Sequence, residues 1–546
     1  MRLPRRPVGL EPRRFSGASA IRASFLAALG VIAAACIKVE ITGIIPDEGG
    51  APTGGTGGTG GAGGSGGSGG VLVPMFQGGR HPATWRVGKT PITGDVPGWF
   101  IPKTAERIKY PTDRQVSPIT ASVAEHLRNV ALHGTNLADN VFMKVGDSIS
   151  DSEYYLNCFK GDINNQAPTR EFNIVWGGYS ALAEAVFHFR SAKIGMTSPF
   201  DRKSATTRVG AAVTFPLEGD PPTPFEQEFT ALSPQFAGTM YGTNDLGVGG
   251  SARTDLGQKI RPYQKGLVTL VDTMLARGIV PWLSTIPPRI DDPQYMEIVP
   301  LFNAVVRGLA EGRQIPLVDF NRDLLAAPFY GLGENGDGVH PNTLDYNTAC
   351  HFDTATLAYG YNIRNLGALT TLDRLMKVVV DGVASLDDTA PTLAGEGNAA
   401  SPFVIDALPF SDMRSTRDAT ANAIMDYSGC AGSKPGRGSE YWYRLDLTAA
   451  TPLRAVVLDG SVDHGPADGP VDVDVYLLDA TRSGPGCLKS ADAVIEGTIG
   501  PGTFYIVVDT TGAGAESAGE FTLSVVPCAS TDERCGTAVN AAAKRH

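Results

Sequence analysis

Three short blocks carry side chains of the types that cleave esters by nucleophilic attack. Gly146-Asp147-Ser148 follows the apolar run Val141–Val145, and Gly242-Thr243-Asn244-Asp245 follows Phe236–Tyr241. Asp337-Gly338-Val339-His340 lies further along in a glycine-rich stretch. A serine hydroxyl is a weak nucleophile at neutral pH, so it needs a base to remove its proton and donors to hold the oxyanion. The combination of serine, histidine, acid and asparagine therefore points to acyl transfer.

Each of these residues has its own predicted role. Ser148 is the predicted nucleophile, because a turn after a strand places its hydroxyl at the carboxyl edge of a sheet, where open α/β folds carry their sites. His340 is the predicted base, and Asp337 is the acid that fixes the imidazole tautomer. Asn244 offers a side-chain N–H to the oxyanion, together with the backbone N–H groups of Ser148 and Gly210.

Taken singly, each block is common in turns and carries little information. Their joint presence, in one order and each after a strand or loop, favours a functional site. We expect Asp147 and Asp245 to cap a helix or pin a loop rather than to catalyse.

The three blocks in this order resemble the SGNH family, also called the GDSL hydrolases. On this resemblance Ser148 is the family's serine, Asn244 its asparagine and His340 its histidine, with Asp337 as the acid. The resemblance covers about residues 80–385. It implies a serine esterase that needs no cofactor and no catalytic metal.

The glycine of the oxyanion pocket is the part of the chain that departs from the family's pattern. The family's usual Asn-x-Gly-x-Ser-Gly block is not found here. We prefer Gly210, because the stretch from it to Asn244 has the length of one crossover. Gly178 in Trp-Gly-Gly-Tyr is the alternative.

The order of elements in residues 79–385 predicts an α/β domain, a flavodoxin-like three-layer α/β/α arrangement around a parallel sheet. Short apolar runs predict buried strands, at 143–145, 236–241, 280–284 and 316–319. Amphipathic stretches between them predict helices, at 224–232, 265–277 and 296–312. The longer segment Trp176–Thr207 is expected to be an insertion, either a lid or wall beside the site or a surface decoration.

Residues 1–36 are predicted to be an export signal. Basic residues precede the apolar run Phe25–Ala35, which is too short to span a membrane comfortably, and Cys36 follows three alanines. This pattern resembles a bacterial lipoprotein signal, which implies lipidation of Cys36 and attachment to the cell envelope or outer surface. An ordinary secretory signal is the alternative. Residues 37–78, rich in Gly, Ser and Thr, are predicted to be a flexible tether.

Residues 398–528 are predicted to form a β-sandwich, preceded by a linker at 386–397 and followed by a tail at 529–546. Evenly spaced strand patterns separated by turn residues support this, at 441–445, 453–458, 471–478, 502–508 and 521–526. Their order resembles the bacterial pre-peptidase C-terminal domain, which follows the catalytic domains of many secreted enzymes. Asp472 and Asp474 suit a calcium site, but one open face of a sheet explains them equally well and is preferred.

Cysteine usage fits export. Six cysteines remain beyond Cys36, an even number that an oxidising compartment permits. Cys158 lies ten residues after Ser148, and Cys350 lies ten residues after His340. Because both loops should leave the same edge of the sheet, we predict a Cys158–Cys350 disulfide.

The remaining cysteines indicate further disulfides rather than a zinc site, and the charge balance argues against a nucleic-acid partner. Cys528 and Cys535 are close enough for local pairing, which would leave Cys430 for Cys487, although the sequence alone does not fix this connectivity. The pattern contains no typical zinc spacing. The formal net charge of −11 and the lack of a basic stripe exclude nucleic acid as an expected partner.

These features predict a secreted serine esterase that acts on a small-molecule or polysaccharide ester. One alternative is a surface-anchored binding or adhesion lipoprotein that keeps an inactive hydrolase scaffold. The complete set Ser148, Asn244, Asp337 and His340 argues against it, since an inactive scaffold does not need all four. Another alternative keeps the enzyme and changes the substrate to an acetylated carbohydrate.

Overall fold

The computed structural model describes residues 98–539, apart from 103–106, 161–173, 249–255, 346–347, 421, 431–435, 437, 461–470, 511–517 and 530. The predicted signal with Cys36 and the predicted tether at 37–78 lie outside the described residues. Internal contacts place all the described residues in one compact unit. Within the described ranges, no helix has the length and apolar character needed to cross a bilayer.

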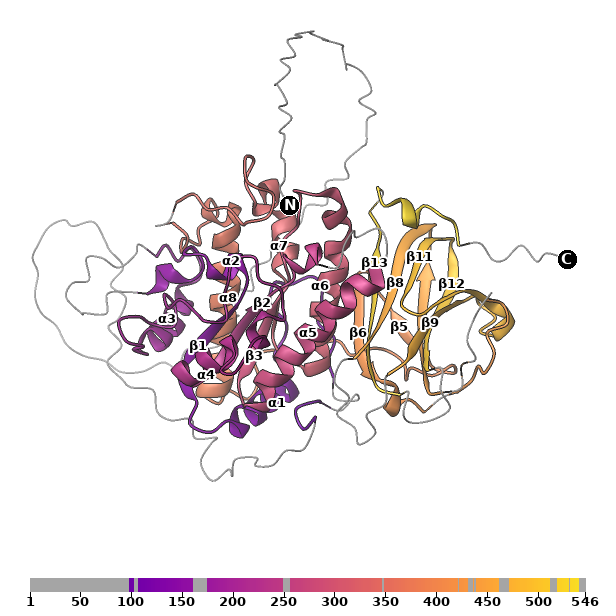
Figure 1. Cartoon of the computed structure of the whole chain (residues 1–546), viewed down its shortest axis with the longest axis horizontal. Helices are drawn as coiled ribbons and strands as arrows, with labels where there is room; N and C mark the ends of the chain where they lie inside the picture. The colour runs from indigo at the N-terminus through magenta and orange to yellow at the C-terminus, as the bar shows by residue number, and fades with distance from the viewer. Residues whose placement is uncertain are drawn as a thin grey trace, which may run out of the picture. The chain divides into compact units, whose positions relative to one another are not determined.

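Parallel strands form the sheet at the centre of the α/β part (Figure 1). Their order is β1 (Ala138–Gly146), β2 (Pro234–Met240), β3 (Val280–Ser284) and β4 (Leu317–Val318). Every residue of β2 is buried, as a strand covered on both faces requires. An isolated parallel bridge from Thr207 to Gly146 extends the sheet beyond β1. With this bridge, β1 has a parallel neighbour on each side, so it lies inside the sheet.

Helices alternate with the strands and pack against the sheet and one another. They are α1 (Ala121–His133), α2 (Ser148–Asp151), α3 (Ala183–Arg190), α4 (Pro224–Leu232), α5 (Leu256–Ala276), α6 (Pro293–Arg313), α7 (Phe320–Ala326) and α8 (Gly360–Leu375), which continues as a π-helical turn at Met376–Val380. α4 has the predicted bounds because Thr223 and Glu226 form a reciprocal capping box and Pro224 opens the helix. α5 and α6 extend beyond their predicted ranges.

The insertion at Trp176–Thr207 contributes to the core through α3. Ala185, Val186 and Phe189 are buried, and the Phe189 ring contacts Phe142 of β1 and Phe236 of β2 edge-on. This helix is therefore part of the α/β core and is more than the surface decoration that was one of our two expectations for the segment.

Two antiparallel-rich sheets form the C-terminal β region, residues 403–539. One sheet has the order β10-β9-β12-β7-β5 and the other β11-β8-β13-β6. The strands are β5 (Phe403–Ile405), β6 (Phe410–Ser415), β7 (Glu440–Leu447), β8 (Thr451–Asp459), β9 (Val473–Leu478), β10 (Cys487–Ala491), β11 (Val494–Ile499), β12 (Gly502–Thr510) and β13 (Glu520–Pro527). Residues of both sheets share one hydrophobic core, which includes Tyr443 of β7 and Phe521 of β13.

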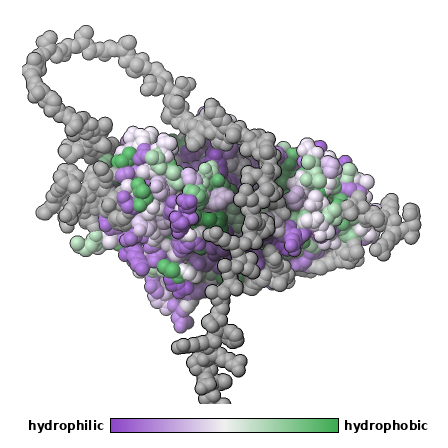
Figure 2. All heavy atoms as spheres, turned by 90° about the horizontal axis from the view of Figure 1, so that it is seen from above, coloured by the Kyte–Doolittle hydropathy of each residue, from purple (hydrophilic) through white to green (hydrophobic). Residues whose placement is uncertain are grey.

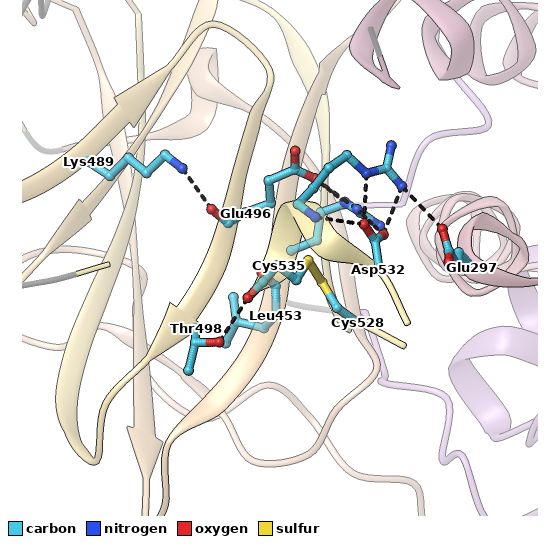
Figure 3. Close-up of a disulfide and its surroundings, with 10 residues drawn as sticks. Glu297, Leu453, Lys489, Glu496, Thr498, Cys528, Asp532 and Cys535 are labelled. Carbon is cyan, nitrogen blue, oxygen red and sulfur yellow. Dashed lines mark hydrogen bonds and ion pairs between the residues drawn. A yellow bond between two sulfur atoms is a disulfide. The ribbon is translucent and has the colours of Figure 1, made fainter. Parts of the chain in front are cut away.

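The described residues after Cys528 pack on this region, although we expected a tail from residue 529. A disulfide joins Cys528 to Cys535, and the buried Asp532 carboxylate accepts hydrogen bonds from Arg454 of β8 and from Arg534 (Figure 3). Arg534 also forms an ion pair of 3.9 Å with Glu297 of α6. The segment is ordered by covalent and ionic contacts that its polar composition does not reveal.

α6 packs on both the α/β core and the C-terminal β region. Gly308 and Gly312, one turn apart, face strands of the β region. A Cβ atom on Gly308 would lie 3.1 Å from Thr522, and one on Gly312 would lie 2.9 Å from Met413. Glycine at these positions allows the sheet to approach the helix backbone closely.

A buried cation strengthens the same junction. The Arg313 side chain at the end of α6 is fully buried. It donates to Asp272 of α5 at 2.7 and 2.9 Å and to Glu520 of β13 at 2.5 and 2.8 Å. The two carboxylates raise the pKa of Arg313 against the effect of burial, which is the largest single influence and acts in the opposite direction. One charged side chain thus joins the two parts of this unit.

Candidate active site

The turn that carries Ser148 begins where β1 ends. Asp147 is the N-cap of α2, and its Oδ1 accepts a hydrogen bond of 3.0 Å from the Ile149 N–H. This is the local role expected for Asp147. Gly146 is required by the tight approach, because a Cβ there would lie 2.2 Å from Ser150 Oγ and 2.6 Å from the Met240 carbonyl. Ser148 therefore opens a helix of only one turn at the carboxyl edge of the sheet.

The hydroxyl, imidazole and carboxylate predicted from distant blocks lie in hydrogen-bonding sequence. Ser148 Oγ is 2.8 Å from His340 Nε2, across 192 residues of chain. His340 Nδ1 is 2.5 Å from Asp337 Oδ2, and Asp337 Oδ1 accepts the N–H groups of Val339 and His340 at 2.9 and 2.8 Å. The acid therefore holds both the backbone and the ring of its histidine.

Electrostatics keep this acid ionised. Partial burial acts to raise the pKa of Asp337, but hydrogen bonds from the backbone N–H and imidazole of His340 and from the Val339 N–H outweigh it and lower the pKa. An ionised Asp337 favours the tautomer in which Nδ1 carries the proton, which leaves Nε2 as an acceptor facing Ser148.

The segment around Gly210 lies between the Ser148 turn and Asn244. The Arg208 N–H donates to the Gly146 carbonyl at 3.2 Å, and Asn244 Nδ2 donates to the Ala211 carbonyl at 3.1 Å. Among the described residues, the backbone N–H groups of Ser148 and Gly210 have no hydrogen-bond partner. Nδ2 of Asn244 keeps a second N–H, so three donors are available at this edge.

The alternative glycine lies elsewhere. The strand bridge nearest to Gly178 joins Val175 to His351, and Phe352 N–H donates to the Val175 carbonyl at 2.7 Å. A Cβ on Gly177 would lie 2.3 Å from the Phe352 carbonyl oxygen, whereas one on Gly178 would meet nothing within 4 Å. These contacts of the segment are thus with the chain after Cys350. Gly210 lies on the segment that bonds to both Gly146 and Asn244, through Arg208 and Ala211.

A segment that follows β3 supports both the Asn244 turn and the base loop, and the sequence-based predictions did not include it. Arg289 Nη1 donates to the Thr243 carbonyl at 2.5 Å, and the same guanidinium forms a bidentate pair with Asp291 at 2.7 and 2.6 Å. The Ile290 N–H donates to the Gly338 carbonyl at 3.0 Å. Gly338 has a φ of +75°, and a Cβ there would lie 2.8 Å from the Asp291 nitrogen. The arginine after Pro287-Pro288, directly past a predicted strand, was the available signal.

α8 holds the other side of the Ser148 turn. The buried Arg364 donates to the Ile149 carbonyl and, at 2.7 Å, to Ser150 Oγ. Asn365 accepts from the Leu156 N–H and donates to the Ala349 carbonyl, both at 2.9 Å. This amide links the nucleophile loop to the base loop, and its position inside a helix gave no signal in the sequence.

A disulfide makes the same connection covalently. Cys158 and Cys350 are bonded, with a Cα–Cα distance of 5.8 Å, as predicted from their equal spacing after Ser148 and His340. The structure also pairs Cys430 with Cys487 and Cys528 with Cys535, the connectivity that the sequence left open.

Two buried carboxyl groups lie behind this site. Asp245 Oδ1 accepts the Val213 N–H at 3.1 Å, which pins the Gly210 segment as expected. The second oxygens of Asp147 and Asp245 have no hydrogen-bond partner among the described residues. Burial raises the pKa of Asp147 to about 6 and that of Asp245 to about 7, and the charge of Asp147 adds to the shift of Asp245.

These raised pKa values predict a pH-dependent stability. The folded protein retains protons on both carboxyls that the unfolded chain releases near pH ~4, so their contribution to the free energy of unfolding falls as pH rises from about 4 to about 7. We expect Asp245→Asn to gain stability relative to the wild type between pH 5 and pH 8. Urea denaturation at the two pH values measures this gain. A gain that shrinks as pH rises would contradict the assignment.

Carboxylates also cluster in the C-terminal β region. Asp472, Asp474 and Asp492 each bring one oxygen within 4.8 Å of the others. Acidic side chains are common on sheet faces without a bound ion. From the sequence this explanation is preferred for Asp472 and Asp474, and we assign no metal site to the cluster.

The part of the chain that carries the later blocks of this site matches a known family. Residues 197–346 match the GDSL-like Lipase/Acylhydrolase family. The GDSL-like region contains Gly210, Asn244, Asp337 and His340, and Ser148 lies before it. No curated protein matches the sequence significantly.

Solved structures of low sequence identity are also similar to this chain. An acetylxylan esterase from Geobacillus stearothermophilus has 16% identity and a TM-score of 0.26, with 44% of this chain and 95% of that chain covered. A GDSL-like lipase from Bacteroides thetaiotaomicron VPI-5482 has 14% identity and a TM-score of 0.26, with 46% and 97% covered. An alpha/beta hydrolase enzyme from the metagenome of Lake Arreo, Spain, has 18% identity and a TM-score of 0.27, with 44% and 97% covered.

Proposed function

We propose that this protein is a serine esterase that hydrolyses carboxylic esters. The observation that carries the proposal is the chain of short contacts from Ser148 Oγ to His340 Nε2 at 2.8 Å and from His340 Nδ1 to Asp337 at 2.5 Å. The match of the GDSL-like region to an acylhydrolase family supports it.

In the proposed acylation step, the Ser148 hydroxyl attacks the ester carbonyl as His340 Nε2 takes its proton. Asp337 stabilises the imidazolium through Nδ1–H. The carbonyl oxygen becomes an oxyanion that accepts from the N–H groups of Ser148 and Gly210 and from Asn244 Nδ2. The imidazolium then protonates the leaving alcohol, and the acyl group remains on Ser148.

Deacylation reuses the same groups. His340 Nε2 takes a proton from water, whose oxygen attacks the acyl carbonyl. A second oxyanion forms in the same pocket and collapses, and Ser148 Oγ regains a proton from the imidazolium as the carboxylic acid leaves. The Arg289 contact with the Thr243 carbonyl and the Arg364 contact with Ser150 Oγ hold the oxyanion side and the nucleophile side during both steps.

Asn244→Ala tests the oxyanion assignment. We expect kcat for a p-nitrophenyl ester to fall about 10²–10³-fold, or ~3 kcal/mol of transition-state stabilisation, because one preorganised donor is lost. Steady-state kinetics of the purified variant measures the change. The matched control is Asn140→Ala, which removes an exposed amide bonded to Ser191 Oγ at 2.8 Å. A kcat within about three-fold of the wild type in Asn244→Ala would exclude this donor.

A fluorophosphonate probe separates the esterase from a binding or adhesion protein on an inactive scaffold. A competent nucleophile and base attack phosphorus and leave a covalent adduct, so we expect peptide mapping to find the probe on Ser148. A folded protein that stays unlabelled would favour the binding alternative. Turnover of acetylated xylan against simple esters then separates a carbohydrate esterase from a general one.

We further propose that the protein is exported and anchored through a lipid on Cys36. The three disulfides of the described cysteines support an oxidising compartment. Cys36→Ala should move the protein from the membrane fraction to the soluble fraction of the producing cell. An ordinary secretory signal would give soluble protein in both cases.

A further inference from the structure

A short turn after α7 has an unusual backbone. In the single 3₁₀ turn Pro328–Gly331, Phe329 has φ 49° and ψ 34°, and Tyr330 has φ 57° and ψ 26°. Gly331 continues with φ 63°. Side chains other than glycine are disfavoured in the left-handed region, and bulky ones are genuine outliers there. Two adjacent aromatic residues in this conformation therefore indicate a local cost in stability.

The surrounding chain holds this turn in place. The Tyr330 N–H donates to the Ala327 carbonyl at 3.0 Å, and the Leu332 N–H donates to the Phe329 carbonyl at 3.1 Å. A Cβ on Gly331 would lie 2.4 Å from the Leu324 side chain, so the backbone has little room to change. Strain that is over-determined in this way tends to occur at functional sites.

The turn is attached to the loop that carries the base. The Asn342 N–H donates to the Gly331 carbonyl at 2.8 Å, and Asn342 is the second residue after His340. Asn342 Oδ1 in turn accepts the Gly360 N–H at 2.8 Å at the start of α8. One backbone hydrogen bond thus joins the turn that carries the aromatic residues to the loop that carries His340.

Packing does not explain the strain. Phe329 is 55% exposed and Tyr330 is 38% exposed, so neither ring fills the core. Leu325 and Leu344, on the two segments that meet at the Gly331–Asn342 contact, are 51% and 58% exposed. Figure 2, which shows the molecule from above, has hydrophobic residues in patches among hydrophilic ones. Exposed apolar side chains on segments that are joined to a site provide contact area for an apolar ligand.

We propose that Phe329 and Tyr330 form a contact site for an apolar group of the ester substrate, beside the base. The inference rests on the proposed esterase function and narrows its substrate class. The Phe329 ring has no polar atom and Tyr330 carries only its hydroxyl, so these two side chains offer mainly apolar contact area. An alkyl chain needs only apolar contact, which Phe329, Leu325 and Leu344 provide.

Glycine substitutions test the proposal, because they should raise the stability of the protein and lower its preference for a long acyl chain. Phe329→Gly and Tyr330→Gly relieve the left-handed strain, so we expect a higher Tm. We also expect the ratio of kcat/KM for p-nitrophenyl octanoate to that for p-nitrophenyl acetate to fall about ten-fold. Phe329→Asn and Tyr330→Asn repeat the test with a side chain that tolerates this conformation, in case the glycine variants fail to fold.

The matched control is Ser233→Gly. Ser233 is also left-handed, with φ 43°, but it caps α4 before the start of β2, at the other end of that strand from Asn244. We expect the control to raise Tm and to leave the octanoate-to-acetate ratio unchanged.

The outcomes distinguish this inference from the proposed function. If the fluorophosphonate probe labels wild-type protein at Ser148 but the Phe329 and Tyr330 variants keep the wild-type octanoate-to-acetate ratio, the inference alone is overturned. A loss of acetylated-xylan turnover without a change in the ratio would assign the site to a sugar and overturn the apolar assignment. A folded wild-type protein that is neither labelled nor active on either ester would overturn the proposed function and this inference together.

Discussion

Ser148→Ala is expected to lower kcat for a p-nitrophenyl ester by about 10⁴-fold or more while the protein stays folded. The size follows from the role, because the acyl-enzyme cannot form without the hydroxyl, and the remaining base and oxyanion donors have no covalent step to assist. The structure predicts little change in fold, since the only side-chain hydrogen bond of Ser148 within the described ranges is to His340. Kinetics and circular dichroism of the same preparation measure both effects.

Ser152→Ala is the matched control for that experiment. Ser152 lies four residues after Ser148, and its hydroxyl accepts the Tyr154 N–H at 3.2 Å. We expect near wild-type turnover in this variant. Equal turnover by Ser148→Ala and the wild type would remove Ser148 as the nucleophile, whatever the control does.

Arg313→Ala is expected to lower the free energy of unfolding by about 3–5 kcal/mol. Removing the guanidinium leaves the carboxylates of Asp272 and Glu520 buried with the cation between them missing. Uncompensated charges in a dry interior cost far more than a surface contact does. Urea denaturation at neutral pH, followed by tryptophan fluorescence, measures the loss.

Arg444→Ala provides the contrast. Arg444 forms a 3.0 Å pair with Asp446, and both side chains are about half exposed, at 46% and 48%. Solvent screening limits such a pair to about 0.2–1 kcal/mol. Similar losses in the two variants would mean that Arg313 does not act as a buried link between the two parts.

The residues of the candidate site could be predicted where a short sequence pattern marks them. Gly146 to Ser148 follow a strand of buried apolar residues, and the hydroxyl reaches the imidazole of His340 as the block order predicted. The Cys158–Cys350 bond followed from equal spacing along two loops of one sheet edge. Such features depend on short-range patterns, which the sequence displays directly.

The supporting residues depend on long-range contacts and were not predictable. Arg289 and Arg364 donate to backbone carbonyls of other segments. The position of Arg289 after Pro287-Pro288 marks it as a residue past a strand, but neither arginine has a local pattern that identifies the carbonyl it binds. The left-handed turn at Phe329 and Tyr330 contradicts local preference and is visible only in three dimensions. The strand position at Thr207 is a single bridge, too short for a periodic signal.

Parts of the C-terminal β region escaped prediction for a related reason. β6 contains Asp412 and Arg414, both buried, which pair with each other, so the strand lacks the apolar–polar alternation of a half-exposed strand. β10 is half-buried at four of its five positions, and β11 alternates half-buried and buried positions but includes Glu496 and Gly497 in its middle. The central strands β7, β9 and β12 carry long apolar runs and were predicted close to their observed bounds.

The close packing of the β region on Gly308 and Gly312 of α6 limits which C-terminal parts this α/β part could carry in evolution. Gly308 and Gly312 fit only a neighbour that comes as close as the strands of the β region do. A gene fusion that exchanged the C-terminal part for an unrelated module would leave these two glycines without a neighbour at the same close distance. The α/β part and the C-terminal β region should therefore be inherited together, and descendants that lost the β region should carry larger side chains at these two positions.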